Sequence, residues 1–108
     1  MVTYEITAIV WHELCARYEE YMIEYHIPDL MATGYFASAT FSRDGDRYRI
    51  RYEARSQTAL DRYLKTQADR LRADMSKHFP GGVKVSREVW NVIAAFDAPK
   101  GRASNRSL

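Results

Sequence analysis

A chain of 108 residues has room for one domain with one core, and its 46% hydrophobic and 28% charged residues are typical of a globular protein. The formal net charge is only +2, far from the basic surface of a dedicated nucleic-acid-binding protein. The single cysteine, Cys15, excludes an internal disulfide, and no run of roughly 20 apolar residues predicts a membrane span. We therefore expect a cytoplasmic protein with neither nucleic acid nor membrane as a partner.

The first predicted elements are a strand and a helix. Residues 2–10 alternate apolar and polar side chains, the pattern of a strand with one buried face. From residue 12 the apolar side chains recur at intervals of three and four, as in an amphipathic helix: Leu14, Tyr18, Tyr21, Met22 and Tyr25. Pro28 disfavours helical dihedral angles at Ile27, so the helix is expected to break there, and a short turn then ends at Gly34.

A hairpin is predicted next, with strands over residues 35–42 and 47–55 and a tight turn at Asp44-Gly45. This turn would pair Phe41 with Tyr48, Ala39 with Ile50 and Ala37 with Tyr52. Tyr48 and Tyr52 would then lie on an apolar face, while Phe36, Arg49 and Arg51 would lie on the opposite, largely polar face.

A second helix follows, with Ser56 as its N-cap and an apolar stripe made of Leu60, Leu64, Ala68, Leu71 and Met75. Pro80 and two glycines end it, and a last strand is expected over residues 83–95. We expect one domain over residues 1–96 and a disordered tail over residues 97–108, which lack apolar periodicity.

The order strand, helix, hairpin, helix, strand predicts an α+β fold of the ferredoxin-like βαββαβ type. Its four-stranded antiparallel sheet carries both helices on one face. The other face stays open and would expose Ile9 and Phe36 in a monomer, so we expect a homodimer that pairs through this face. Arginines on the open face raise an RNA-binding hypothesis, but Tyr48 and Tyr52 face the helices and cannot stack on bases.

The segment HIPDLMATGYF over residues 26–36, together with Tyr63-Leu64 and residues 68–72, resembles a bacterial family of about 100 residues described as a domain of unknown function. The resemblance covers residues 2–95. That family is similar in fold to the dimeric α/β barrels, whose protomers pack sheet against sheet. This superfamily includes cofactor-free monooxygenases, heme-degrading enzymes, small isomerases and stress-induced proteins, and the fold does not choose among these activities.

His26 is the candidate catalytic residue, because an imidazole exchanges protons near neutral pH. It stands where the first helix is expected to end, close to Asp29, whose carboxylate could fix its tautomer. Two interpretations stay open. The histidine either caps free carbonyls at the end of the helix or faces a pocket, where it would act as general base or acid toward an enolisable or phenolic substrate.

Tyrosines converge between the sheet and the first helix. Tyr4, Tyr48 and Tyr52 point to the helix side of the sheet, and a buried tyrosine hydroxyl needs a partner. The convergence predicts a partly polar pocket for a small aromatic or oxygenated ligand. The alternative is an aromatic core whose hydroxyls reach its rim.

Three functions therefore remain open. The first is a dimeric small-ligand-binding protein whose binding residues are Tyr4, His26, Asp29, Tyr48 and Tyr52. The second is a non-catalytic interaction or scaffold module without a pocket, and the third is a cofactor-independent monooxygenase or isomerase-like enzyme. We expect no metal and no cofactor, because no histidine has nearby companion ligands and no glycine-rich phosphate loop is present.

Overall fold

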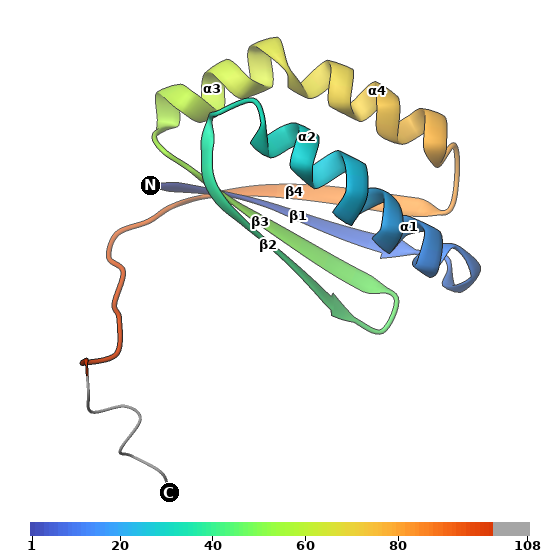
Figure 1. The fold of residues 1–108 in the computed structure, drawn as a ribbon, viewed down its shortest axis with the longest axis horizontal. Helices are drawn as coiled ribbons and strands as arrows, with labels where there is room; N and C mark the ends of the chain where they lie inside the picture. The colour runs from blue at the N-terminus through green and yellow to red at the C-terminus, as the bar shows by residue number, and fades with distance from the viewer. Residues whose placement is uncertain (101–108) are drawn as a thin grey trace, which may run out of the picture.

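The computed structural model describes residues 1–100 and shows two layers, with all helices on one side of a sheet (Figure 1). The elements in chain order are β1 (Val2–Val10), η1 (His12–Leu14), α1 (Cys15–Tyr21), η2 (Met22–His26), α2 (Ile27–Met31), β2 (Phe36–Asp44), β3 (Arg47–Ala54), α3 (Gln57–Thr66), α4 (Ala68–His78) and β4 (Val83–Asn91).

The sheet is antiparallel with the strand order β2-β3-β1-β4, which is the predicted ferredoxin-like arrangement. Tyr48 and Tyr52 are buried beneath the helices, whereas Arg49 and Arg51 are exposed on the other face. The prediction of the covered face is confirmed. It follows from the period-two alternation of β3, in which every second side chain points to the same side.

The predicted register of the hairpin is wrong by two residues. Phe41 lies opposite Ile50 and Ala39 opposite Tyr52, because the loop consists of Gly45-Asp46 and not of Asp44-Gly45. Gly45 has a φ of 65° at the first central position of the turn, as a type II′ turn requires. A shift by two residues preserves the direction of every side chain, so the two faces stay as predicted.

Phe36 was expected on the open face, and this expectation is wrong. The pairing of β2 with β3 is irregular between Phe36 and Ser38, where Ala37 is an extra residue. Such a β-bulge reverses the side to which the preceding side chain points. Phe36 is therefore buried, 2% exposed, with its ring centroid 5.0 Å from that of Tyr63. The expected pairing of Ala37 with Tyr52 is absent because the two-residue shift of the hairpin places Ala39 opposite Tyr52.

The first helix does not break before Pro28. Residues 12–31 stay helical because η2 is a π-helical turn, in which the Ile27 N–H donates to the Met22 carbonyl five residues earlier. The wider turn leaves room in front of the proline ring, which has no N–H to donate. Ile27 keeps helical dihedral angles, and the segment ends before Gly34, whose φ is 84°.

The second helix is two helices. Gln67 leaves helical geometry with a φ of −123°, which separates α3 from α4. The Ser56 Oγ accepts from the Ala59 N–H at 3.0 Å, so the predicted N-cap is present. Strand β4 ends at Asn91, four residues earlier than predicted, and residues 92–100 run away from the sheet (Figure 1).

Of the tail predicted to be disordered, residues 101–108 lie outside the described residues, and residues 97–99 belong to no helix or strand. Within residues 1–100, no helix is both long and apolar enough to cross a membrane.

Gly82 precedes β4 with a φ of 83°, and a Cβ added to it would lie 2.5 Å from Leu14 Cδ1 and 2.8 Å from a Trp11 ring carbon. Gly34 has a similar φ of 84° but open space around it. Gly34→Ala should therefore cost about 1–2 kcal/mol of unfolding free energy through backbone strain alone. Gly82→Ala should cost about 1–3 kcal/mol more through overpacking. Urea unfolding of both variants measures the difference, and equal losses would contradict the close packing of Trp11 and Leu14.

Candidate functional site

A cavity of about 230 Å³ lies between the helix layer and the sheet. Strands β1, β3 and β4 form one wall, while α1, η2 and α4 form the other. Its lining is mainly apolar, with a few polar side chains: Ile6, Tyr18, Met22, His26, Ile50, Tyr52, Arg72, Met75, Ser76, Phe79, Val83, Val85 and Arg87. A small, mostly apolar space with few polar groups is typical of a site for a small molecule.

His26 reaches this cavity because it closes the π-helical turn η2. Its Nδ1 atom is buried and finds no hydrogen-bond partner among residues 1–100. Burial lowers the pKa of His26 to about 4, an effect that the charges of Asp74 and Asp29 oppose and that of Arg87 assists. The imidazole is therefore neutral at neutral pH and can accept a hydrogen bond.

The helix continues through α2 beyond His26, so no helix end with free carbonyls lies at this position. The interpretation of His26 as a helix cap thus loses its structural basis. π-helical turns often occur at functional sites, because they redirect one side chain within an otherwise regular helix.

Tyr52 brings a second polar group to the same cavity from the centre of the sheet. Its side chain is 0% exposed, and its hydroxyl is the other buried atom that lacks a partner among the described residues. Burial raises the pKa of Tyr52 well above its usual value, so the hydroxyl keeps its proton and can donate it in a hydrogen bond. An unpaired buried hydroxyl costs about 1–3 kcal/mol, which a suitable ligand would recover.

Tyr4 lies next to this cavity and does not line it. The Arg72 guanidinium donates to the Tyr4 hydroxyl at 3.0 Å, and Arg72 itself lines the cavity. Tyr4 therefore positions a lining residue. The structure brings together His26 and Tyr52 of the predicted set, and it adds Tyr4 through Arg72.

Asp29 and Tyr48 are not part of this arrangement. The Asp29 carboxylate pairs with Arg70 at 3.1 Å on the outer surface between α2 and α4, so it does not fix the tautomer of His26 through a hydrogen bond. The reason is the unbroken helix, which turns Asp29 outward. Tyr48 does not line the cavity, although its ring centroid lies 5.1 Å from that of Tyr18, which does.

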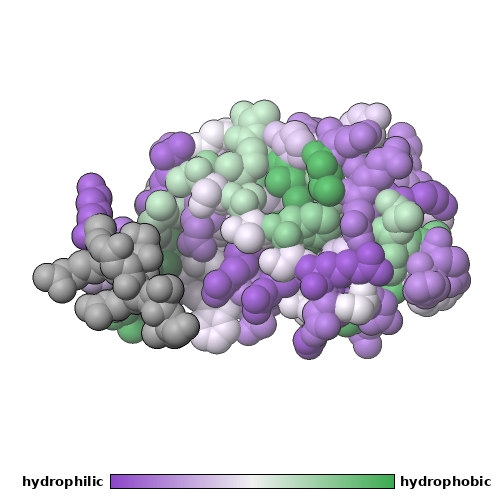
Figure 2. Space-filling view, turned by 60° about the horizontal axis from the view of Figure 1, so that its bottom comes forward, coloured by the Kyte–Doolittle hydropathy of each residue, from purple (hydrophilic) through white to green (hydrophobic). Residues whose placement is uncertain are grey.

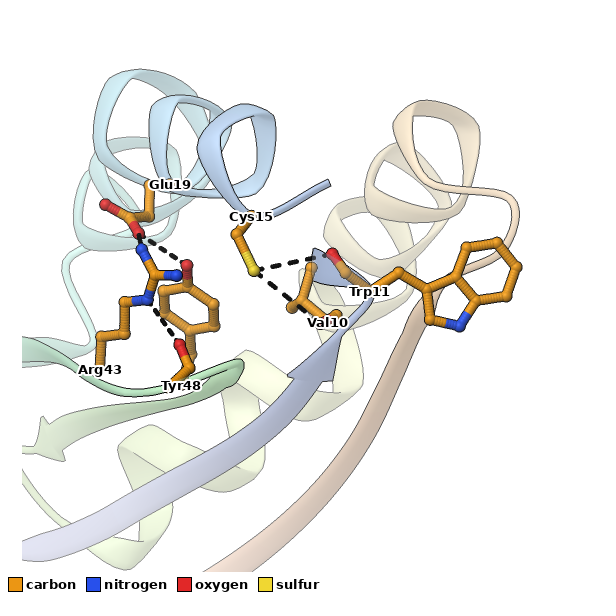
Figure 3. Close-up of polar contacts among 7 residues, drawn as sticks. Val10, Trp11, Cys15, Glu19, Arg43 and Tyr48 are labelled. Carbon is orange, nitrogen blue, oxygen red and sulfur yellow. Dashed lines mark hydrogen bonds and ion pairs between the residues drawn. The ribbon is translucent and has the colours of Figure 1, made fainter. Parts of the chain in front are cut away.

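The environment of Tyr48 is a separate polar cluster (Figure 3). Its hydroxyl donates to Glu19 Oε2 at 2.6 Å, and the same carboxylate oxygen pairs with Arg43 Nη1 at 2.6 Å. Burial and the bond to Glu19 raise the pKa of Tyr48. Nearby, the buried Cys15 thiol points to the Val10 and Trp11 carbonyls, which agrees with a packing role for this cysteine. This cluster ties α1 to the hairpin.

Two lining arginines escaped the sequence analysis. Arg87 continues the inward alternation of Val83 and Val85 along β4, so its parity already placed it on the covered face. Arg72 is not a member of the predicted apolar stripe, yet it follows the buried Leu71 and its long side chain reaches over the edge of that stripe. Strand parity could have predicted the position of Arg87, whereas the position of Arg72 depends on packing.

The fold and this cavity can now be compared with known proteins. A family model for a domain of unknown function, DUF4286, matches residues 1–93. The chain belongs to the DUF4286 family. The match covers every helix and strand of the described residues and leaves out only residues 94–100 among them. A search of curated proteins finds no match to this DUF4286 chain.

Solved structures share the fold of the DUF4286 chain at low sequence identity. One is a putative antibiotic biosynthesis monooxygenase from Deinococcus radiodurans, 16% identical with a TM-score of 0.64, covering 92% of this chain and 99% of that one. A variant of MhuD with two manganese protoporphyrin IX bound per active site is 11% identical with a TM-score of 0.68, over 91% and 100%. A dimeric ferredoxin-like protein from an uncultured marine organism is 14% identical with a TM-score of 0.59, over 91% and 100%.

The buried neutral state of His26 predicts a pH dependence of stability. Its pKa is about 4 in the folded protein and near 6.5 in the unfolded chain, so between these values only the unfolded state binds the proton. Because this proton favours the unfolded state, the free energy of unfolding has its full value above pH 6.5. It falls by on the order of 2–3 kcal/mol as the pH decreases toward 4.

His26→Gln should not show this loss of unfolding free energy at low pH. Urea unfolding of the wild type and the variant at pH 7 and pH 4.5 isolates the contribution of His26, because all other titrating groups are common to the two proteins. An equal loss of stability in both would show that His26 titrates near its ordinary pKa in the folded state.

Proposed function

We propose that this protein binds a small aromatic molecule carrying a hydroxyl group in the cavity between its sheet and helices, and that it does so as a homodimer. The observation that carries the proposal is a pair of unpartnered buried atoms, the Tyr52 hydroxyl and His26 Nδ1, on two residues that line one cavity. Buried polar groups in folded proteins are nearly always paired, so two exceptions at one cavity support a binding role.

The chemistry of the two groups favours a hydroxyl. A phenol oxygen can accept from the Tyr52 hydroxyl while its own proton is donated to the neutral His26 ring. One ligand group would thereby satisfy both atoms. The remaining wall includes the side chains of Met22, Ile50 and Phe79, which suit the faces of an aromatic ring.

The same geometry argues against a scaffold module with a filled core. The cavity is smaller than the roughly 300–1,000 Å³ of pockets for drug-sized ligands, which favours a ligand of one or two rings. A mere packing defect would be expected to be apolar, since an empty cavity lined by unpaired polar groups is costly.

An enzyme that acts on this ligand is the second candidate. The neutral His26 ring can accept a hydrogen bond from a bound phenol, and Tyr52 can donate to the oxygen on which charge develops, while the pKa of about 4 makes His26 a weak base toward the phenol proton. Two proteins that share the fold are described as monooxygenases of antibiotic biosynthesis, one of them as putative. Cofactor-independent oxygenation or isomerisation of an enolisable ligand would use these two residues.

The binding proposal predicts that phenol occupies the cavity and that toluene, which lacks the hydroxyl, binds more weakly. Titration followed by NMR should shift the His26 ring resonances with phenol. Tyr52→Phe should weaken phenol binding by about tenfold, because one buried hydrogen bond is lost. Tyr25→Phe is the matched control, since Tyr25 is 61% exposed on the outer helix surface.

Absence of any shift at His26 with phenol would contradict the proposal. Equal binding of phenol and toluene would show that the two polar atoms do not recognise the ligand.

The dimer is proposed to form through the open face of the sheet. Ile9 on β1 and Trp90 on β4 are 40% and 52% exposed there. Figure 2, turned so that the lower side of Figure 1 comes forward, shows hydrophobic patches among polar residues. Arg51 pairs with Glu5 at 2.9 Å on this face, which neutralises charge that sheet pairing would cover. A dimeric ferredoxin-like protein with the same fold supports the arrangement.

Sedimentation equilibrium should give twice the 12.6 kDa chain mass at micromolar concentration. Ile9→Lys should shift the protein toward monomer, because a charge in an apolar contact must lose its hydration. Ile23→Lys is the matched control, since Ile23 is 59% exposed on the helix side. A wild-type monomer, or dissociation by the Ile23 change alone, would contradict this interface.

A further inference from the structure

We propose that the ligand of the cavity is an anion, an aromatic carboxylate that places its ring and hydroxyl inside and its carboxylate between Arg72 and Arg87. This inference rests on the proposed binding function and specifies the substrate class. Its basis is the distribution of charge around the cavity. Two guanidinium groups line it, and none of the described residues in its wall is an Asp or a Glu.

The pairing of the arginines strengthens this argument. On the rest of the surface, Arg43, Arg47, Arg51 and Arg70 each form an ion pair with a carboxylate, while among the described residues Arg17, Arg49, Arg55 and Arg62 form none. Among residues 1–100, Arg72 instead donates to the neutral Tyr4 hydroxyl, and Arg87 makes no ion pair. The positive charge at this cavity is therefore free to meet an anion, and a planar guanidinium suits a carboxylate.

The two arginines come from different layers of the fold. Arg72 lies on α4, and Arg87 lies on β4 at the register position of Ile6. Arg72 is half-buried and Arg87 is exposed, so both reach the outer part of a cavity whose deep wall holds Tyr52. The charge of Arg87 also acts on His26, where the charges of Asp74 and Asp29 oppose it.

A ligand that satisfies all four groups has a hydroxyl at one end of an aromatic ring and a carboxylate at the other. The hydroxyl meets Tyr52 and His26, the ring meets the apolar wall, and the carboxylate meets the guanidinium groups. Its single ring agrees with the volume of about 230 Å³. The simplest probe of this kind is para-hydroxybenzoate.

The test compares para-hydroxybenzoate with its neutral isostere para-hydroxybenzamide, using NMR titration of the full chain. The carboxylate should bind at least about tenfold more tightly than the amide, because an ion-paired hydrogen bond replaces a neutral one. Arg87→Gln should remove most of this difference. Arg62→Gln, the matched control, changes an exposed arginine of α3 that does not line the cavity and should leave binding unchanged.

The outcomes separate the two proposals. If acid and amide shift the His26 resonances with equal affinity and Arg87→Gln has no effect, the anion inference is overturned and the binding proposal stands. If neither compound shifts His26, both proposals fail. If Arg62→Gln weakens binding as much as Arg87→Gln does, the preference comes from overall charge and the assigned carboxylate site is wrong.

Discussion

The backbone hydrogen bond from the Ile27 N–H to the Met22 carbonyl determines how the helix layer meets the sheet. A regular helix would meet Pro28 with an unmatched carbonyl and a steric clash, and a broken helix would turn the chain away. The π-helical turn avoids both. It keeps α1 and α2 in one direction over the sheet and rotates His26 toward the interior, while Asp29 faces the outer surface.

Hydroxyl groups in the aromatic core show how the protein distributes its polar contacts. Tyr4 is bonded to Arg72, Tyr21 to Asp74 and Tyr48 to Glu19, so each of these hydroxyls reaches a charged group near the surface. Tyr52 is in the middle of the sheet, too deep for such a partner. The core is thus held at its rim by charged partners, and the hydroxyl at its centre has no partner among the described residues.

The sequence predicted the fold and the faces of the sheet because strand parity survives errors of two residues. It failed at Phe36, where a single extra residue inverts parity, and at Pro28, where a rare backbone turn replaces a break. Of the candidate site, His26 and Tyr52 both line one cavity. The positions of Tyr48 and Asp29 depended on which partner each side chain finds in space, and local periodicity carries no such information.

The β-bulge at Ala37 has a consequence for comparing this chain with its relatives. A relative without the extra residue would have one residue fewer between the helix layer and the hairpin, and an ungapped alignment would match Phe36 with a side chain on the opposite face. Substitution patterns at this position would then mix a core residue with surface residues. A gap placed at Ala37 restores the correspondence, so alignments of the family should be anchored on β3 and on the aromatic neighbours of Phe36.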